Sequence, residues 1–527
     1  MSSNWEQLAA DKRKRLAKTI PQQWRIREVP GNDSVIDYPR TAGILSKREL
    51  EITELCASQL VSNLASNSLS AVEVTLAFCK RTAIAQQLTN CVHEFFPEAA
   101  FSQAKELEEY FAKHGKPVGP LHGLPVSLKN QLRGYETSMG YISWLGKYDK
   151  EDSVMTHLLR KAGAIFYVKT SVPQTVLVCE TVNNIIGTTT NPRNRNWSCG
   201  GSSGGEGALL AMRGSVLGVG TDSGGSIRVP AAFNSMYGLR SSHGRLPYAK
   251  MANSMEGQET TVHSVVGPMG HSVENLRLFV QAVLEQEPWK FDSKVIPMPW
   301  RQSEADMVRA KIQTGGLTIG VFNFDCNVLP HPPVLRGIGI AVAALNRNGH
   351  KVVPWKPYKH NHGCELMNRV WAADASTDPI GIKELWEIQT ERWAYQNEYL
   401  EKWREAEDQL GTVLDAIIAP VAPAAAVRHG RFGYSFLINL LDFISVVVLV
   451  GFAEAGIDRR NQVYVLVSEL DKAMQEEYDP QAYHGAPVAV QVIGRRLSEE
   501  KTLAVAKELA NSLGRKEAVS LVLNSRL

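Results

Sequence analysis

The alternation of apolar and polar residues along this chain predicts strands and helices that follow one another over most of its length. Residues 123–129 are strand-like, because their apolar side chains alternate with Ser127 and Lys129. A helical period follows over 152–163, and 165–168 is a second apolar strand. A strand, a helix and a strand at this spacing are typical of a parallel sheet.

The same alternation returns through the rest of the chain. Two capping boxes, Ser46 with Glu49 and Ser70 with Glu73, each predict the start of a helix. The most apolar run, 436–452, is interrupted by polar residues and predicts a buried helix that continues into a strand, not a membrane span. Further strands are expected at 237–239, 317–322, 351–355, 416–419 and 488–493, and further helices at 334–346, 384–410 and 498–513.

These elements predict one large α/β domain over residues 46–527, with a central sheet covered by helices. Residues 1–45 precede it as a helix and an arm that wraps the surface. The basic run Lys12–Arg15 in this helix is typical either of a nuclear address or of an exposed helix face. The second interpretation predicts that Leu8 and Leu16 on the other face turn inward.

Charge and composition argue against several classes of function. The 527 residues carry 57 basic and 54 acidic side chains, a net charge of +3, so no excess charge favours nucleic acid as a partner. We expect no signal peptide and no stable membrane insertion. Seven scattered cysteines without a C-x-x-C pair indicate free thiols in a reducing compartment, which favours the cytoplasm. The last residues, Ser525-Arg526-Leu527, are close to a peroxisomal address, which would operate only on an exposed tail.

Known cofactor and metal motifs are not found in the sequence. It holds no phosphate-binding loop ending in Gly-Lys, no complete dinucleotide fingerprint and no His/Cys/carboxylate metal motif. We therefore expect no cofactor and no metal. The sequence leaves the oligomeric state open, a homodimer included.

One stretch, 196–228, holds the most concentrated candidate chemistry. It is NWSCGGSSGGEGALLAMRGSVLGVGTDSGGSIR, two Gly/Ser loops that flank a helix-like and a strand-like segment. Ser226 ends the second loop, where the backbone N–H groups of 223–226 could form an oxyanion hole beside a hydroxyl nucleophile. The alternative is a plain flexible loop. Asp222 and Arg228 flank the loop and are expected to brace it through an ion pair and hydrogen bonds.

Three further side chains are candidates. Lys129 on its apolar strand would lose hydration, which lowers the pKa of a lysine and allows the neutral amine to act as a general base. The alternative is a lysine that reaches the edge of the sheet. Ser202 satisfies the G-x-S-x-G pattern, but the polar residues before it argue against a nucleophile elbow. Cys199 beside this loop is either a nucleophile or a small buried side chain, as free cysteines commonly are.

With Lys129, Ser202 and Ser226 taken together, the chain resembles the amidase signature family, in its fungal acetamidase or general amidase branch. The stretch 200–233 closely matches the signature of that family, and 485–494 is similar to another of its landmarks. The resemblance covers nearly the whole chain. It implies an α/β fold with a central mixed sheet.

The resemblance also implies a role for each candidate. Lys129 matches the base, Ser202 the bridging serine and Ser226 the acyl nucleophile. Neutral Lys129 would take a proton from Ser202, which would take one from Ser226 as Ser226 attacks the amide carbonyl. A cis peptide bond is implied before Ser202. The matching oxyanion-hole and substrate-binding positions are the backbone N–H groups of Ser223, Gly224, Gly225 and Ser226, together with Ser202 and, in the acyl pocket, Val176.

The implied activity is hydrolysis of small, acetamide-like carboxamides to an acid and ammonia through an acyl-enzyme. The alternatives are a fatty-acid amide hydrolase with a longer acyl channel, an amidotransferase subunit, a histidine-dependent hydrolase, and an inactive protein that kept the fold. Asn130, Ser223, Leu449 and the short segment 372–383 depart from the family pattern. These departures bear on the electrostatics around the base and on the substrate range.

Overall fold

A mixed sheet of eleven strands runs through the centre of the molecule, in the order β1-β3-β2-β8-β10-β9-β14-β15-β13-β11-β12. The computed structural model describes residues 5–129, 132–252, 262–375, 380–430, 436–461 and 464–514. The strands are β1 (Val92–Phe95), β2 (Pro125–Leu128), β3 (Ile165–Thr170), β8 (Leu217–Asp222), β9 (Tyr237–Arg240), β10 (Val265–Gly270), β11 (Thr318–Val321), β12 (Lys351–Pro354), β13 (Ala416–Pro420), β14 (Ile444–Phe452) and β15 (Pro487–Gly494). Two small ribbons, β4–β5 (Val182–Asn183, Gly187–Thr188) and β6–β7 (Thr190–Asn191, Asn194–Ser198), lie outside the sheet.

Strand direction changes along the sheet. Strand β2 is parallel to β3 and to β8, and β11 is parallel to β12 and to β13. The strands from β8 to β13 between these units alternate in direction. The parallel strand–helix–strand unit expected at 123–168 is confirmed, and so is the α/β class with a mixed sheet.

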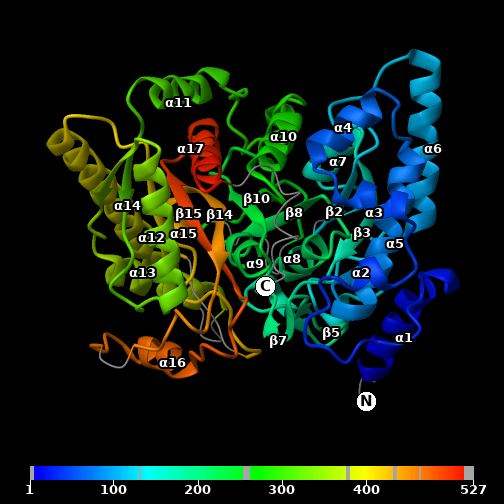
Figure 1. The fold of residues 1–527 in the computed structure, drawn as a ribbon, viewed down its shortest axis with the longest axis horizontal. Coiled ribbons are helices and arrows are strands. Elements are labelled where there is room, and N and C mark those ends of the chain that lie inside the picture. The colour runs from blue at the N-terminus through cyan, green and yellow to red at the C-terminus, as the bar shows by residue number, and fades with distance from the viewer. Residues whose placement is uncertain are drawn as a thin grey trace.

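Helices cover both faces of this sheet, which explains why β2, β3, β8, β10 and β15 are buried along their whole length. In Figure 1 the N-terminal helices α1 to α7 gather at the right of the sheet and α12 to α15 at its left. The helices are α1 (Trp5–Lys18), α2 (Tyr38–Thr41), α3 (Lys47–Glu54), α4 (Ala57–Ala65), α5 (Ala71–Thr89), α6 (Pro97–His114), α7 (Val154–Lys161), α8 (Gly204–Ala211), α9 (Arg228–Phe233), α10 (Val273–Leu284), α11 (Gln302–Thr314), α12 (Pro332–Arg347), α13 (His360–Ala375), α14 (Ile382–Leu410), α15 (Leu437–Leu441), α16 (Glu469–Glu477) and α17 (Glu499–Ser512).

Local sequence signals set several of these boundaries. The side chain of Ser46 accepts a hydrogen bond from the Glu49 N–H and the Glu49 carboxylate accepts one from the Ser46 N–H, so the predicted capping box begins α3. At the start of α5, the side chain of Ser70 accepts a hydrogen bond from the Glu73 N–H, which is one of the two hydrogen bonds of a capping box. The apolar run 436–452 forms α15 and then β14, as its interrupted pattern predicts.

The N-terminal helix differs from its prediction. Leu16 is buried as expected, but Leu8 is 51% exposed, and Lys12, expected on the exposed face, is only 3% exposed. The ammonium of Lys12 contacts the carboxylates of Glu94 and Glu136, which come from other elements. The periodicity of a single helix predicts that Lys12 faces solvent. The prediction was wrong because Lys12 pairs with two carboxylates that are distant in the sequence.

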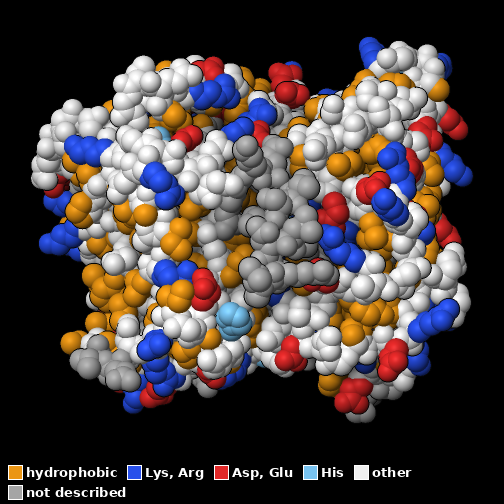
Figure 2. Space-filling view, viewed as in Figure 1, with side chains coloured by type: hydrophobic (Ala, Val, Ile, Leu, Met, Phe, Trp, Pro, Cys, Tyr) orange, Lys and Arg blue, Asp and Glu red, His pale blue; other side chains and the backbone are white. Residues whose placement is uncertain are grey.

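The segment after α1 follows the surface and lies against the β6–β7 ribbon. The Val35 N–H donates to the carbonyl of Pro192 at 2.8 Å, and the Arg195 N–H donates to the carbonyl of Asp33 at 2.9 Å. Figure 2 shows acidic and basic side chains interspersed over one face of the molecule, in keeping with the small net charge. Among the helices of the described residues, none has the length and apolar character that a membrane crossing requires.

Candidate active site

Three segments meet where β2 and β8 end. These neighbouring parallel strands pair Ser127 with Gly218, so Lys129 and the loop after Asp222 leave the same edge of the sheet. The third segment, Gly200–Ser203, leads into α8, which packs against β8. The fold therefore brings together residues that lie up to about a hundred positions apart in the sequence.

Lys129 lies at the centre of this meeting point. Its Nζ is 2.7 Å from Ser202 Oγ, 2.9 Å from Ser203 Oγ and 2.8 Å from Thr221 Oγ1. Burial lowers the pKa of Lys129 to about 7, although the charges of Asp222 and Glu206 oppose this shift. Of the two interpretations of Lys129 in the sequence, the structure therefore favours the buried lysine with a lowered pKa.

The three hydroxyl partners suit a neutral amine, which has two N–H donors and one lone pair. Ser203 Oγ donates to the Thr221 carbonyl at 3.3 Å, so it is free to accept an N–H from Lys129. Thr221 Oγ1 can accept the other N–H. The lone pair of Lys129 is then left for the hydroxyl proton of Ser202, in the direction that the base role requires.

Ser202 is fully buried, and the Gly201–Ser202 peptide bond is cis, as the family resemblance implies. The Ser203 N–H donates to the carbonyl of Ser226 at 3.1 Å, which holds the two loops side by side. Within the part of the chain that the structure describes, no hydrogen bond joins Ser202 Oγ to Ser226 Oγ. Of the two proton transfers that the family resemblance implies, the one between Ser202 and Lys129 has a hydrogen bond in this structure. The one between Ser226 and Ser202 has none among the described residues.

An ion pair braces the loop after β8, as the sequence predicts. Asp222 and Arg228 are both fully buried and 3.1 Å apart, and Asn439 Nδ2 donates to Asp222 Oδ1 at 2.8 Å. Burial favours the neutral acid, but Arg228 and its hydrogen bonds outweigh this and hold the pKa of Asp222 far below its usual range. The loop thus rests on a permanently ionised carboxylate.

This carboxylate also takes one of the four expected oxyanion-hole donors. The Gly225 N–H donates to Asp222 Oδ1 at 2.7 Å. The N–H groups of Ser223, Gly224 and Ser226 have no partner among the described residues. Three of the four amides are therefore available to a substrate oxygen in this structure, and the Gly225 amide is engaged by its own loop.

A cavity of about 80 Å³ opens onto this group, lined by Lys129, Thr221, Ser223 and Val176 among others. Val176 has φ +64°, which is rare for a β-branched residue, and its neighbour Thr175 has φ +70°. Thr175 and Val176, both with positive φ, form part of the wall of this cavity. The predicted pocket position of Val176 agrees with this lining.

Trp371 of α13 packs against the loop after β8. A Cβ atom placed on Gly224 would lie 2.6 Å from Trp371 Cζ2, so only glycine allows this ring to approach. The ring packs edge-on against Phe436, with 4.8 Å between the ring centroids. The loop is therefore held from outside by an aromatic pair that sequence reasoning did not identify.

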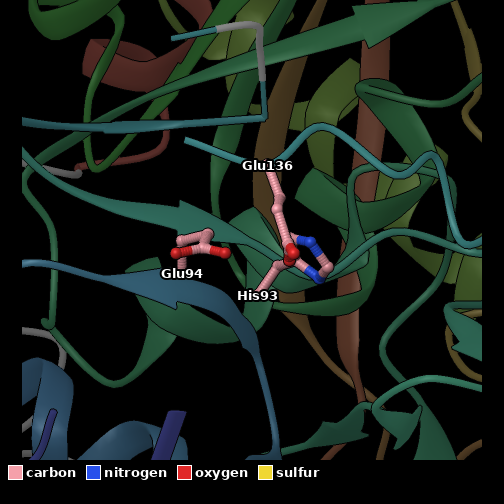
Figure 3. A group of neighbouring side chains, drawn as sticks. All are labelled: His93, Glu94 and Glu136. Carbon is pink, nitrogen blue, oxygen red and sulfur yellow. The ribbon is translucent and has the colours of Figure 1, made fainter. Parts of the chain in front are cut away.

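Polar and charged side chains form the far wall of the cavity. Figure 3 shows His93, Glu94 and Glu136 turned toward one another, with ligand atoms within 4.8 Å. This spacing would suit a metal ion, but the ammonium of Lys12 already contacts both carboxylates and lies 2.6 Å from Glu136. Lys169 lines the same wall and donates to the carbonyl of Glu136 at 2.6 Å. Burial lowers the pKa of Lys169 to about 8.

Glu206 is a second residue that the sequence analysis missed. It is fully buried on α8 and accepts hydrogen bonds from Ser127 at 2.6 Å and from Thr170 at 3.0 Å. Burial raises its pKa to about 7. A glutamate between two glycines, just before the apolar residues of α8, was the signal that could have marked it.

Two other positions singled out in the sequence can be located in the structure. Cys199 is fully buried and its thiol donates to the Thr189 carbonyl at 3.2 Å, and burial raises its pKa, so it fills space and does not act as a nucleophile. Leu449, one of the departures from the family pattern, lies within β14 and lines a different cavity from the one beside Lys129. Asn130 and the C-terminal Ser525-Arg526-Leu527 lie outside the described residues, as does part of 372–383.

Comparison with known proteins gives a consistent result. The sequence matches the Amidase family model over residues 73–381 and 381–503. It is 66% identical to an acetamidase of Emericella nidulans over 98% of this chain and 99% of that protein, and 58% identical to an acetamidase of Aspergillus oryzae over 97% and 99%. The structure is similar to a fatty acid amide hydrolase at a TM-score of 0.90 and 33% identity, covering 97% and 96% of the two chains. A bacterial aryl acylamidase shares the fold at a TM-score of 0.69 and 19% identity, over 88% and 97%.

Proposed function

This chain belongs to the amidase family, and we propose that it hydrolyses small carboxamides with Ser226 as nucleophile, Ser202 as bridging serine and Lys129 as base. It is a hydrolase that cleaves the C–N bond of linear amides, as its similarity to two acetamidases over nearly its whole length indicates. One observation carries the assignment of roles. The Nζ of Lys129, whose pKa burial lowers to about 7, lies 2.7 Å from Ser202 Oγ.

The proposed reaction begins with two proton transfers. Lys129 accepts the hydroxyl proton of Ser202, Ser202 accepts that of Ser226, and Ser226 Oγ bonds to the carbonyl carbon of the amide. The carbonyl oxygen becomes an oxyanion, which the N–H groups of the Ser223–Ser226 loop stabilise. When the C–N bond breaks, the proton on Lys129 returns through Ser202 to the leaving nitrogen, which departs as ammonia.

A water molecule then completes the cycle. Its oxygen attacks the acyl ester on Ser226, while its proton passes through Ser202 to Lys129. The ester bond breaks, Ser226 recovers its proton, and the carboxylic acid leaves. The same three side chains thus act in both halves, and the neutral state of Lys129 is required at the start of each.

The shape and lining of the cavity support short acyl groups. Its volume is about 80 Å³, and its far wall carries His93, Glu136 and Lys169. A long hydrocarbon chain in this direction would remove water from charged groups without pairing them, which is unfavourable. The alternative, cleavage of longer acyl amides, is favoured by the TM-score of 0.90 to a fatty acid amide hydrolase.

A series of acyl lengths distinguishes these two substrate classes. We expect kcat/KM for ammonia release to be highest for acetamide or propionamide and to fall from butyramide to hexanamide and oleamide. The Ser226→Ala variant, measured with each amide, gives the background. A steady rise in kcat/KM with chain length would overturn the short-acyl proposal in favour of the alternative.

The subcellular location and the oligomeric state are proposed from the sequence. We infer import into peroxisomes when Ser525-Arg526-Leu527 is exposed, and residence in the cytoplasm when it is not. A fluorescent protein fused to the N-terminus should enter peroxisomes, and the same fusion with one extra residue after Leu527 should not. We also infer a homodimer, for which sedimentation equilibrium of the purified protein is the direct measurement.

A further inference from the structure

A second cavity, of about 800 Å³, lies at the other end of β8 from the catalytic loop. Arg213, which precedes β8, and His271, which follows the antiparallel neighbour β10, both line it. Since a strand rises about 3.3 Å per residue, the length of β8 separates this cavity from the catalytic loop by about 17 Å. It is therefore not an extension of the substrate pocket.

Positive charge is in excess around this cavity. Six Lys or Arg side chains line it against four Asp or Glu side chains. Three of the guanidinium groups share a single carboxylate, because Arg40, Arg81 and Arg213 lie 3.3, 2.9 and 3.7 Å from Glu54. One carboxylate balances one of these charges, so the other two are left to be balanced from elsewhere.

Arg193 forms no ion pair with a carboxylate among the described residues, although the charge of Asp37, which also lines the cavity, acts on it. Its guanidinium lies against the ring of Phe452, at 5.0 Å from the centroid, and its buried Nε has no hydrogen-bond acceptor. Burial lowers the pKa of Arg193 to about 10, so the group stays charged at neutral pH. Because this partly buried guanidinium forms no ion pair, an anionic ligand could supply one.

Two other polar atoms of the same cavity also lack partners. Ser235 is 8% exposed and its Oγ makes no hydrogen bond within the described chain. His271 is 4% exposed; its Nε2 lies 3.0 Å from the Leu210 carbonyl, whereas its Nδ1 is unpaired. The unpaired atoms of Arg193, Ser235 and His271 are therefore open to the polar groups of a bound molecule.

We propose that this cavity binds a small organic anion, with a carboxylate or phosphate group held by Arg193 and an apolar body packed against Phe452. The guanidinium fork matches either group in two parallel hydrogen bonds. Ile340 and Met236 continue the apolar surface beside Phe452. A volume of about 800 Å³ is typical of a site for a molecule much larger than a bare inorganic ion.

Calorimetric titration of the full-length protein tests this proposal with three probes of similar size at matched ionic strength. Phenyl phosphate and phenylacetate carry the two anionic groups, and 2-phenylethanol is the neutral control. We expect one or both anions to bind and the alcohol not to bind, and the stronger anion identifies the preferred group. Ser226→Ala should bind equally well, which separates this cavity from the active site.

Two arginine variants locate the binding. Arg193→Met should weaken it at least about tenfold, the loss expected for a charge-assisted hydrogen bond. Arg309→Met, at an exposed ion pair on α11, should bind like the wild type. The melting temperature of Arg193→Met without ligand should not fall, because the substitution removes a partly buried charge that forms no ion pair; a purely structural arginine would lower it. Amide hydrolysis by Arg193→Met should stay normal, so this test is independent of the proposed function.

The proposal is overturned if neither anion binds better than 2-phenylethanol, or if Arg193→Met binds as tightly as the wild type. Should Arg193→Met fail to fold, Ser235→Ala serves in its place. That variant removes only the unpaired hydroxyl and should weaken binding severalfold, while unchanged binding by it would count against the site.

Discussion

Lowering the pH from 8 to 6 should reduce kcat/KM about tenfold, because the general base becomes protonated. Burial lowers the pKa of Lys129 to about 7. The active form is the neutral amine, so activity rises with pH through this value. A group with a pKa of 7 is neutral in about one molecule in eleven at pH 6 and in about ten of eleven at pH 8, which gives the ratio.

A second buried group titrates in the same range and must be separated from the first. Burial raises the pKa of Glu206 to about 7, so it too loses a proton between pH 6 and 8. Glu206→Gln removes this titration and keeps a side chain of the same shape, with an oxygen that can still accept from Ser127 or Thr170. If Lys129 is the base, the variant keeps the rise in kcat/KM but moves its midpoint to a lower pH, because the charge of Glu206 raises the pKa of Lys129.

Ammonia release from acetamide between pH 5.5 and 9, at constant ionic strength, gives the profile of kcat/KM for the free enzyme. Melting temperatures recorded at each pH exclude unfolding as the cause of lost activity. A wild-type profile that is flat from pH 6 to 8 would refute the lysine base. If the wild-type profile rises and the Glu206→Gln profile is flat, the pH dependence of kcat/KM comes from the Glu206 carboxylate and not from Lys129.

Three substitutions test other parts of the site. Ser226→Ala should abolish ammonia release without changing the melting temperature, and residual turnover near the wild-type rate would disprove the nucleophile. Gly224→Ala places a Cβ 2.6 Å from Trp371 Cζ2 and should cut kcat/KM by about a hundredfold through displacement of the loop. The control Gly339→Ala, where nothing lies within 4 Å of the added carbon, should leave kcat/KM unchanged. Lys12→Met leaves the partly buried Glu94 without its ion pair and the buried Glu136 with only the Arg15 guanidinium at 3.4 Å, and should cost about 3–5 kcal/mol of unfolding free energy, measured by denaturant titration. Adding Glu136→Gln should recover part of that loss, and no recovery would show that Lys12 acts through something other than charge.

Much of the fold follows from signals within single segments. The Ser46 capping box, the alternating residues of 123–129 and the interrupted run 436–452 each determine a local structure that survives in the folded chain. The order of the strands does not follow from these signals. The antiparallel insertion of β10 between β8 and β9 depends on long-range pairing, which the period of one segment does not encode.

The site divides in the same way. Lys129 and Ser202 stand in patterns that mark them, and the structure brings their side chains to 2.7 Å. Trp371 carries no such pattern, because an aromatic residue in a helix is most often part of the core. Its contact with Gly224 depends on how α13 meets a loop nearly 150 positions earlier in the sequence. Local sequence patterns do not predict long-range contacts of this kind.

Lys12 shows what such a contact does to the site. The helix that carries it was expected to lie outside the main domain, yet its ammonium, together with the Arg15 guanidinium, contacts Glu136 in the wall of the cavity beside Lys129. The backbone carbonyl of Glu136 in turn accepts from Lys169 in that wall. Besides burial, the charge of Lys12 helps to keep the pKa of Lys169 down at about 8. Since each of these groups is buried, moving one changes the field on the others. The charges of the N-terminal helix therefore contribute to the electrostatics of the cavity beside Lys129, although more than a hundred residues separate Lys12 from Lys129.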